Sequence, residues 1–149
     1  MPKTKTRLRG EPDREPRAQY AALPWRRTAN GGIEVLLITS RETRRWVIPK
    51  GWPINGLRSG PSAAREAMEE AGVEGEIGKK PIGVYHYDKR LRSGRLQHVR
   101  VSVYALHVAR ELAVWPEMGQ REKLWATTEA AAATVDEPEL QAVLKAFRP

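Results

Sequence analysis

Three glutamates lie close together in the segment Gly51 to Val73, which reads GWPINGLRSGPSAAREAMEEAGV. Pro61 suits the first turn of a helix and Gly72 suits the left-handed residue that ends one, so this spacing predicts a helix from about Pro61 to Ala71. At about 100° per residue, the three glutamates share one side of that helix, while alanine and methionine occupy the other. The three are Glu66, Glu69 and Glu70.

An acidic stripe on an amphipathic helix is most often a face exposed to solvent. Two features favour a functional role here. Like charges four residues apart destabilise a helix slightly, and a glycine-containing loop precedes this helix where a tighter connection would suffice. Clustered carboxylates supply the oxygen ligands that Mg²⁺ uses together with water and substrate phosphates. The segment therefore predicts phosphate transfer or hydrolysis with a divalent cation, Mg²⁺ or Mn²⁺.

The same segment resembles the Nudix box, G-x5-E-x7-R-E-U-x-E-E-x-G-U, in which U is an apolar residue. The positions that agree are Gly51, Arg65, Glu66, Ala67, Glu69, Glu70, Gly72 and Val73. Leu57 stands where the pattern has glutamate. In the family that glutamate commonly pairs with the box arginine, so Arg65 needs another partner. Glu69, four residues further on, is the candidate.

The resemblance implies an α+β fold, the Nudix fold, in which a mixed β-sheet is sandwiched between α-helices. It covers about residues 17–147. In detail the chain is most similar to the diphosphoinositol polyphosphate phosphohydrolases and their bacterial relatives. The shared motifs are TSR before RRWVIP, then REAMEEAGVEG, and later GQREKLWAT followed by a helix.

For the site, the resemblance implies that water attacks a pyrophosphate bond with the help of Mg²⁺. Glu66 and Glu70 are the expected metal ligands, with Glu69 and the backbone carbonyl of Gly51 beside them. Glu69 is the first candidate for the general base, and a carboxylate base predicts activity that rises toward alkaline pH. The alternatives for that role are Glu66, Glu117 and Glu122. The side chains expected to contact substrate phosphates are Arg41, Arg45, Lys50, Lys89, Arg100 and Arg121.

The composition is that of one compact domain. The chain has 149 residues, of which 40% are apolar and 30% are charged. The absence of cysteine excludes a disulfide framework and thiol chemistry. No apolar run is long enough to span a membrane, so we expect a cytoplasmic protein without a membrane partner. The formal net charge of +8, with arginine outnumbering lysine, favours a polyanionic ligand because the guanidinium group binds phosphate bidentately.

The organisation along the chain predicts a tail followed by one domain. Residues 1–16 are rich in proline and charge and predict a flexible tail, leaving 17–149 as the domain. Strands are expected at 19–25, 33–39, 46–48, within 76–88, at 100–108 and at 124–126. A turn at Asn30-Gly31 joins the first two into a hairpin. Two helices follow near the C-terminus, the first capped by Thr127 or Thr128 and the second by Asp136.

Three functions are consistent with these features. The first is Mg²⁺-dependent hydrolysis of a small polyphosphorylated substrate, either a diphosphoinositol polyphosphate or a dinucleoside polyphosphate. The second keeps the reaction but acts on nucleotide sugars, nucleoside triphosphates or capped RNA, the only form in which a nucleic acid is expected as a partner. The third is a catalytically inactive basic module that binds polyanions, for which Leu57 is the only direct support.

Overall fold

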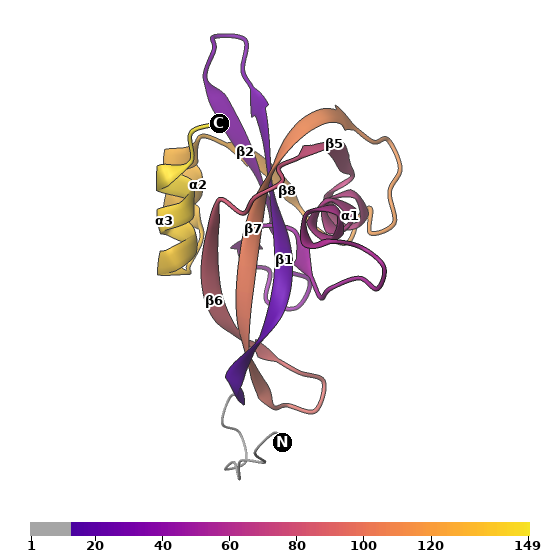
Figure 1. The fold of residues 1–149 in the computed structure, drawn as a ribbon. Helices are drawn as coiled ribbons and strands as arrows, with labels where there is room; N and C mark the ends of the chain where they lie inside the picture. The colour runs from indigo at the N-terminus through magenta and orange to yellow at the C-terminus, as the bar shows by residue number, and fades with distance from the viewer. Residues whose placement is uncertain (1–12) are drawn as a thin grey trace.

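The computed structural model describes residues 13–149, and its centre is one eight-stranded mixed sheet with helices on both faces. The long strands β1 (Asp13–Arg27) and β7 (Leu96–Glu111) run parallel to each other in the middle of this sheet. Helix α1 (Ser59–Ala71) covers one face, while α2 (Thr128–Thr134) and α3 (Pro138–Ala146) cover the other (Figure 1). The expected α+β architecture is confirmed.

The remaining strands extend the sheet on both sides of this central pair. On one side β2 (Ile33–Thr39) pairs with β1, and it is flanked by β3 (Trp46–Val47) and β8 (Lys123–Ala126). On the other side β5 (Val73–Ile77) and β6 (Gly83–Arg90) both pair with β7. The short strand β4 (Lys50–Gly51) pairs with the middle of β1. All of these pairings are antiparallel.

The sheet separates two apolar clusters, because successive side chains of a strand point to opposite faces. Beneath α1, the alanines of its apolar side, Ala63, Ala67 and Ala71, are fully buried together with alternate residues of β1, β2 and β7. Beneath α2 and α3 lies the larger cluster, which includes Leu140 and Leu144 of α3 and Phe147 directly after that helix.

Several element boundaries differ from those expected. The central helix begins at Ser59, two residues earlier than predicted, and Gly72 ends it with φ +68° as expected. Strand β1 begins at Asp13, so residues 13–16 of the expected tail belong to a strand, while residues 1–12 of that tail lie outside the described residues. The division into tail and domain stays a prediction.

The caps of the last two helices were predicted correctly only in part. Thr127 caps α2, because its hydroxyl accepts a hydrogen bond from the backbone N–H of Ala130 at 3.1 Å. The expected cap at Asp136 is wrong. The residue before α3 is Glu137, which makes no side-chain cap, and Asp136 instead pairs with Arg45 at 3.6 Å. None of the helices in the described part of the chain has the length and apolar character needed to cross a membrane.

The packing of α3 gives a first testable prediction. Leu144 is fully buried whereas its neighbour Lys145 is exposed. Replacing Leu144 by alanine leaves a cavity and should lower the free energy of unfolding by about 2–5 kcal/mol, and Lys145→Ala should change it by less than about 0.5 kcal/mol. Urea unfolding followed by circular dichroism measures both. Equal effects of the two substitutions would contradict this packing.

Candidate active site

The three glutamates of α1 differ in their burial. Glu70 points toward the sheet and is only 7% exposed, whereas Glu66 and Glu69 are half-buried. A solvated acidic face would leave all three in water, so that interpretation is wrong for Glu70. A buried carboxyl needs hydrogen bonds or opposite charges around it, and these identify the rest of the site.

Strand β4 approaches α1 closely at Gly51. This strand is paired with Tyr20 and Ala21 of β1, which fixes its position beside the helix. A Cβ atom on residue 51 would lie 2.4 Å from the carboxyl carbon of Glu66. A larger residue at position 51 would therefore displace the Glu66 carboxylate from its present place.

Glu66 and Glu70 are joined by a side-chain hydrogen bond, for which one of the two carboxyls must hold a proton. The pKa of Glu70 is raised to about 8, mainly by burial; Arg121 and Lys50 oppose the rise and the bond to Glu66 contributes to it. Burial also raises the pKa of Glu66, and the negative charges of Glu69 and Glu117 add to that rise. At neutral pH the metal-free pair therefore shares a proton.

Arg121 is the principal cation beside these carboxyls. Its Nη2 atom lies 3.8 Å from Glu70 Oε1 and 3.1 Å from Glu117 Oε1, and its Nη1 atom donates to the backbone carbonyl of Thr39 at 3.1 Å. The side chain is only 10% exposed, so these contacts are made largely out of water. The opposite charge of Arg121 offsets part of the cost of ionising Glu70.

Arg41 lies next to Glu117 rather than next to the helix. Its Nη1 atom is 3.8 Å from Glu117 Oε1 and donates to Gln120 Oε1 at 3.2 Å. The side chain is 58% exposed, so it can turn toward a ligand without breaking buried contacts. Of the two loop acids considered for the general base, the structure brings Glu117 to the helix. Glu122 is 68% exposed and pairs with Arg44.

Lys50 is a cation held next to the buried carboxyl of Glu70. Burial lowers the pKa of its ammonium group to about 8, while the charge of Glu70 acts in the opposite direction. Its Nζ atom lies 5.1 Å from the centre of the Tyr87 ring, whose hydroxyl donates to Gln19 Oε1 at 2.6 Å. Neither Gln19 nor Tyr87 was predicted. A glutamine and a tyrosine inside strand-like sequence carry no signal that distinguishes them from ordinary strand residues.

The other three predicted phosphate contacts lie further from the glutamates. Arg45 pairs with Asp136 at 3.6 Å and with Glu137 at 3.4 Å, in the turn before α3. Lys89 lies on β6, where its charge contributes to lowering the pKa of Lys50. Arg100 is exposed on β7. Their roles as phosphate contacts stay predictions.

The arginine of the box does not form the expected pair. Arg65 is exposed and makes no ion pair with Glu69 or with any other acid among residues 13–149. Leu57, at the position where the resemblance calls for glutamate, is 37% exposed and is bound to the loop through its N–H, which donates to the carbonyl of Ile54 at 3.0 Å. The loop thus keeps its own backbone turn without a glutamate–arginine pair.

The donor chemistry suits a hard divalent cation, although the ligands are not yet arranged around one point. Within the described residues, no three carboxylate, imidazole or thiol groups converge closely enough to hold a metal ion as they stand. Glu70 is bonded to Glu66, and Glu117 is held by Arg121. Loss of the shared proton would free both helix carboxylates as oxygen ligands, which are the kind that Mg²⁺ prefers. The set Glu66, Glu69, Glu70 and Gly51 stays a predicted metal site.

Comparison with known proteins adds independent information. No family model matches the chain. It is 32% identical over 120 residues to Nudix hydrolase 13, mitochondrial, of Arabidopsis thaliana, covering 77% of this chain and 59% of that protein. It is 34% identical over 101 residues to diphosphoinositol polyphosphate phosphohydrolase 3-beta of Homo sapiens, covering 66% of this chain and 57% of that protein.

Among solved structures, the chain is similar to the Ap4A hydrolase of C. elegans. The TM-score is 0.63 at 21% identity, and the match covers 88% of this chain and 95% of that one. This likeness shows the fold. The chain spans somewhat less than two thirds of the length of the two curated relatives.

The buried carboxyl gives a prediction for pH dependence without metal. Glu70 has a pKa of about 8 in the folded protein against 4.5 ordinarily, so the folded state holds a proton that the unfolded state releases. The free energy of unfolding should therefore fall as pH rises from about 4.5 to 8, by on the order of 5 kcal/mol, because one pKa unit corresponds to about 1.4 kcal/mol. Glu70→Gln should remove most of this fall, while Glu76→Gln on the exposed edge of β5 should keep it. Urea unfolding in EDTA at several pH values measures the difference, and parallel curves for wild type and Glu70→Gln would contradict it.

Proposed function

This chain belongs to the Nudix hydrolase superfamily, and we propose that it hydrolyses a pyrophosphate bond in a small polyphosphorylated substrate with the help of Mg²⁺. One observation carries the proposal: the buried carboxyl of Glu70 and the half-buried carboxyl of Glu66 lie on one side of α1, and the charges of Arg121 and Lys50 act on Glu70. Carboxylates attract a metal ion, and cations beside them attract the phosphates that the metal also binds.

The reaction needs a positioned water, a base and neutralisation of the phosphate oxygens. Bound Mg²⁺ would be held by Glu66 and Glu70 and would supply charge neutralisation and a lower pKa for water. Water attacks one phosphorus atom, the bridging oxygen leaves with the other phosphate, and a carboxylate takes the proton. Glu69 is the first candidate for that carboxylate. Glu117 is the alternative best supported by geometry, because its side chain contacts Arg121 and Arg41.

For the substrate we propose a diphosphoinositol polyphosphate or a dinucleoside polyphosphate. The human relative is named for the first class and the C. elegans structure for the second. The far end of the β6–β7 hairpin supports a ligand with several phosphates. It carries exposed arginines that have no acidic partner within the described part of the chain, namely Arg90, Arg92 and Arg95, and the exposed Arg100 follows further along β7. Nucleotide sugars, nucleoside triphosphates and capped RNA are the alternatives, and a cytoplasmic location stays a prediction.

The metal requirement can be tested without a substrate. Mg²⁺ favours the ionised form of Glu70, so its binding at pH 7 should release about one proton and raise the melting temperature. Calorimetric titration in two buffers of different ionisation enthalpy measures the proton release, and thermal shift measures the stabilisation. Glu70→Gln should lose both responses and Glu76→Gln should keep them. An Mg²⁺ response that survives in Glu70→Gln would place the metal elsewhere.

The reaction and the substrate class can be tested by measuring the products released from a panel of substrates in the presence of Mg²⁺. The panel comprises a diphosphoinositol polyphosphate, diadenosine polyphosphates, ADP-ribose, nucleoside triphosphates and capped RNA. We expect turnover of one of the first two classes. Loss of a residue that only supports a metal ligand typically lowers activity about 10- to 100-fold, and Glu70→Gln, which alters an expected ligand itself, should lower kcat by more than that. Glu76→Gln again serves as the control. Turnover confined to the last three would overturn the substrate class, and no turnover at all would favour the inactive polyanion-binding module.

A further inference from the structure

The loop formed by residues 112–122 connects β7 to β8 and carries two groups of the candidate site, Glu117 and Arg121. Most of its side chains are exposed; Val114, for example, is 77% exposed. A loop of this kind would not by itself hold a carboxylate in one place relative to α1. Contacts with the rest of the fold must therefore hold Glu117 beside the helix.

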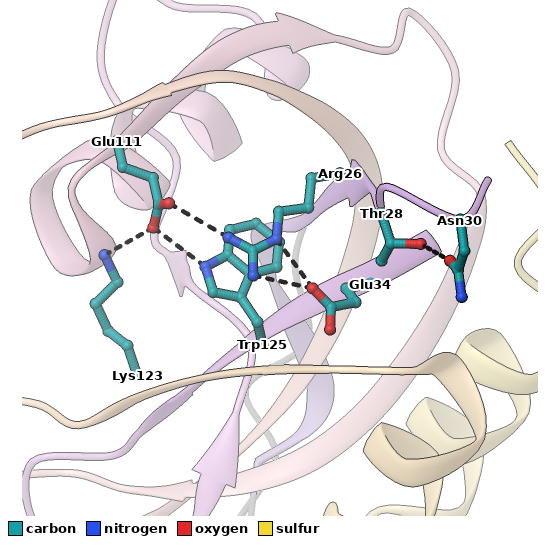
Figure 2. Close-up of polar contacts among 7 residues, drawn as sticks. All are labelled: Arg26, Thr28, Asn30, Glu34, Glu111, Lys123 and Trp125. Atoms are coloured by element: carbon teal, nitrogen blue, oxygen red, sulfur yellow. Dashed lines mark hydrogen bonds and ion pairs between the residues drawn. The ribbon is translucent and has the colours of Figure 1, made fainter. Parts of the chain in front are cut away.

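The two ends of the 112–122 loop are held together by a cluster of polar and aromatic side chains (Figure 2). Glu111, just before the loop, lies 3.7 Å from Lys123 Nζ, just after it. Glu111 also accepts a hydrogen bond from Trp125 Nε1 at 3.1 Å and pairs with Arg26 at 3.4 Å. The guanidinium of Arg26 lies 4.0 Å from the centre of the Trp125 ring. These contacts fix the base of the loop but not its middle.

The middle of the loop is bound to the end of α1. The N–H of Leu112 donates to the carbonyl of Gly72 at 2.7 Å, and the N–H of Glu117 donates to the carbonyl of Glu69 at 3.0 Å. The last carbonyls of a helix have no partner within the helix, so the loop satisfies two groups that would otherwise need water. The backbone of Glu117 is thereby tied to the backbone of Glu69.

Between these two hydrogen bonds the ring of Trp115 packs on the end of the helix. The Trp115 ring covers Gly72 so closely that a Cβ atom on residue 72 would lie 2.4 Å from the ring. The Nζ atom of Lys123 lies 4.6 Å from the centre of the same ring. Trp115 is thus held between the end of α1 and the first residue of β8.

We propose that Trp115 is a positioning residue for the catalytic site: by packing on Gly72 it holds Glu117 and Arg121 against the acidic face of α1, where Glu117 would act on the metal and its water and Arg121 on the substrate phosphates. This inference rests on the proposed function. It also gives Gly72 a second role. Its φ of +68° ends the helix, and its missing side chain makes room for the Trp115 ring.

The test compares Trp115→Ala and Trp115→Phe with Val114→Ala, a truncation of the exposed neighbour in the same loop. Trp115→Ala should weaken Mg²⁺ binding about tenfold in calorimetry and lower kcat about 10- to 100-fold, because a displaced outer group typically costs that much. KM for the substrate should change by less than about threefold, since most phosphate contacts lie outside the loop. Trp115→Phe keeps a ring on Gly72 and should recover most of both losses. Val114→Ala should match the wild type.

A spectroscopic measurement separates positioning from a general loss of stability. In protein labelled with 5-fluorotryptophan, the ¹⁹F resonance that disappears in Trp115→Phe belongs to Trp115. It should shift on Mg²⁺ titration of the wild type, and that shift should be lost in Glu117→Gln. Gly72→Ala should lower kcat through the same contact, so its effect and that of Trp115→Ala should not add in the double variant.

Three results would overturn the proposal. The first is an Mg²⁺ affinity and a kcat of Trp115→Ala within twofold of the wild type, and the second is a loss of affinity and kcat that Trp115→Phe does not recover. The third is an effect on kcat that adds fully when Trp115→Ala is combined with Gly72→Ala. The binding measurements also separate this inference from the proposed function. If the wild type turns over no substrate of the panel, weaker Mg²⁺ binding in Trp115→Ala with an unchanged Val114→Ala still supports the positioning role. If the wild type turns over a substrate while Trp115→Ala binds Mg²⁺ and turns over normally, only the positioning role fails.

Discussion

The burial of the Glu70 carboxyl is the constraint on which the rest of the site depends. Moving an ionised carboxylate out of water is costly, and the protein meets that cost in the metal-free state by leaving a proton on the group, as its pKa of about 8 shows. The proton is shared with Glu66. When this proton is lost, the positive charges of Arg121 and Lys50 offset the negative charge that appears. A divalent cation can take over the role of that proton, because it neutralises both carboxylates at once.

This constraint explains why distant segments must meet at one end of α1. The helix supplies the acids, β4 supplies a glycine that lets its backbone approach Glu66, and the 112–122 loop supplies Arg121. Arg121 is itself fixed from a third direction, by the carbonyl of Thr39 at the end of β2. Apart from α1, these segments are short or irregular, and the central β1–β7 pair is joined to them through β2 and β4. The stable part of the sheet thus positions the irregular parts that carry the chemistry.

How far the sequence predicted this arrangement depends on how local each signal is. The helix, its end at Gly72 and the hairpin turn were predictable, because helix periodicity and left-handed glycine positions depend on adjacent residues. The α+β fold followed from the resemblance. The strand β4 was missed because two residues carry no periodicity, and its pairing with Tyr20 and Ala21 depends on the tertiary fold. The cap at Asp136 failed for a similar reason, since Arg45, far away in the chain, binds that side chain.

The same difference between local and tertiary signals decides which site residues could be predicted. Residue types and helical spacing brought Glu66, Glu69 and Glu70 to one face, but spacing could not show that Glu70 alone is buried, since burial depends on what covers the helix. Arg121 and Arg41 were expected near phosphates and are found among acids, with Glu117 between them. The packing of Trp115 on Gly72 has no sequence signal, because it joins a loop tryptophan to a helix end that lies 43 residues earlier.

The balance of charge in the metal-free site argues that metal and substrate bind cooperatively. Glu117 pairs with both Arg121 and Arg41, so its charge is shared between the two guanidinium groups. A divalent cation held by the carboxylates would compete with these arginines for negative charge and would leave them more available to a phosphate. A bound phosphate would offer the metal further oxygen ligands and would accept hydrogen bonds from the arginines. Each ligand would thus improve the site for the other, and by linkage the free energy that couples them would be the same in both directions.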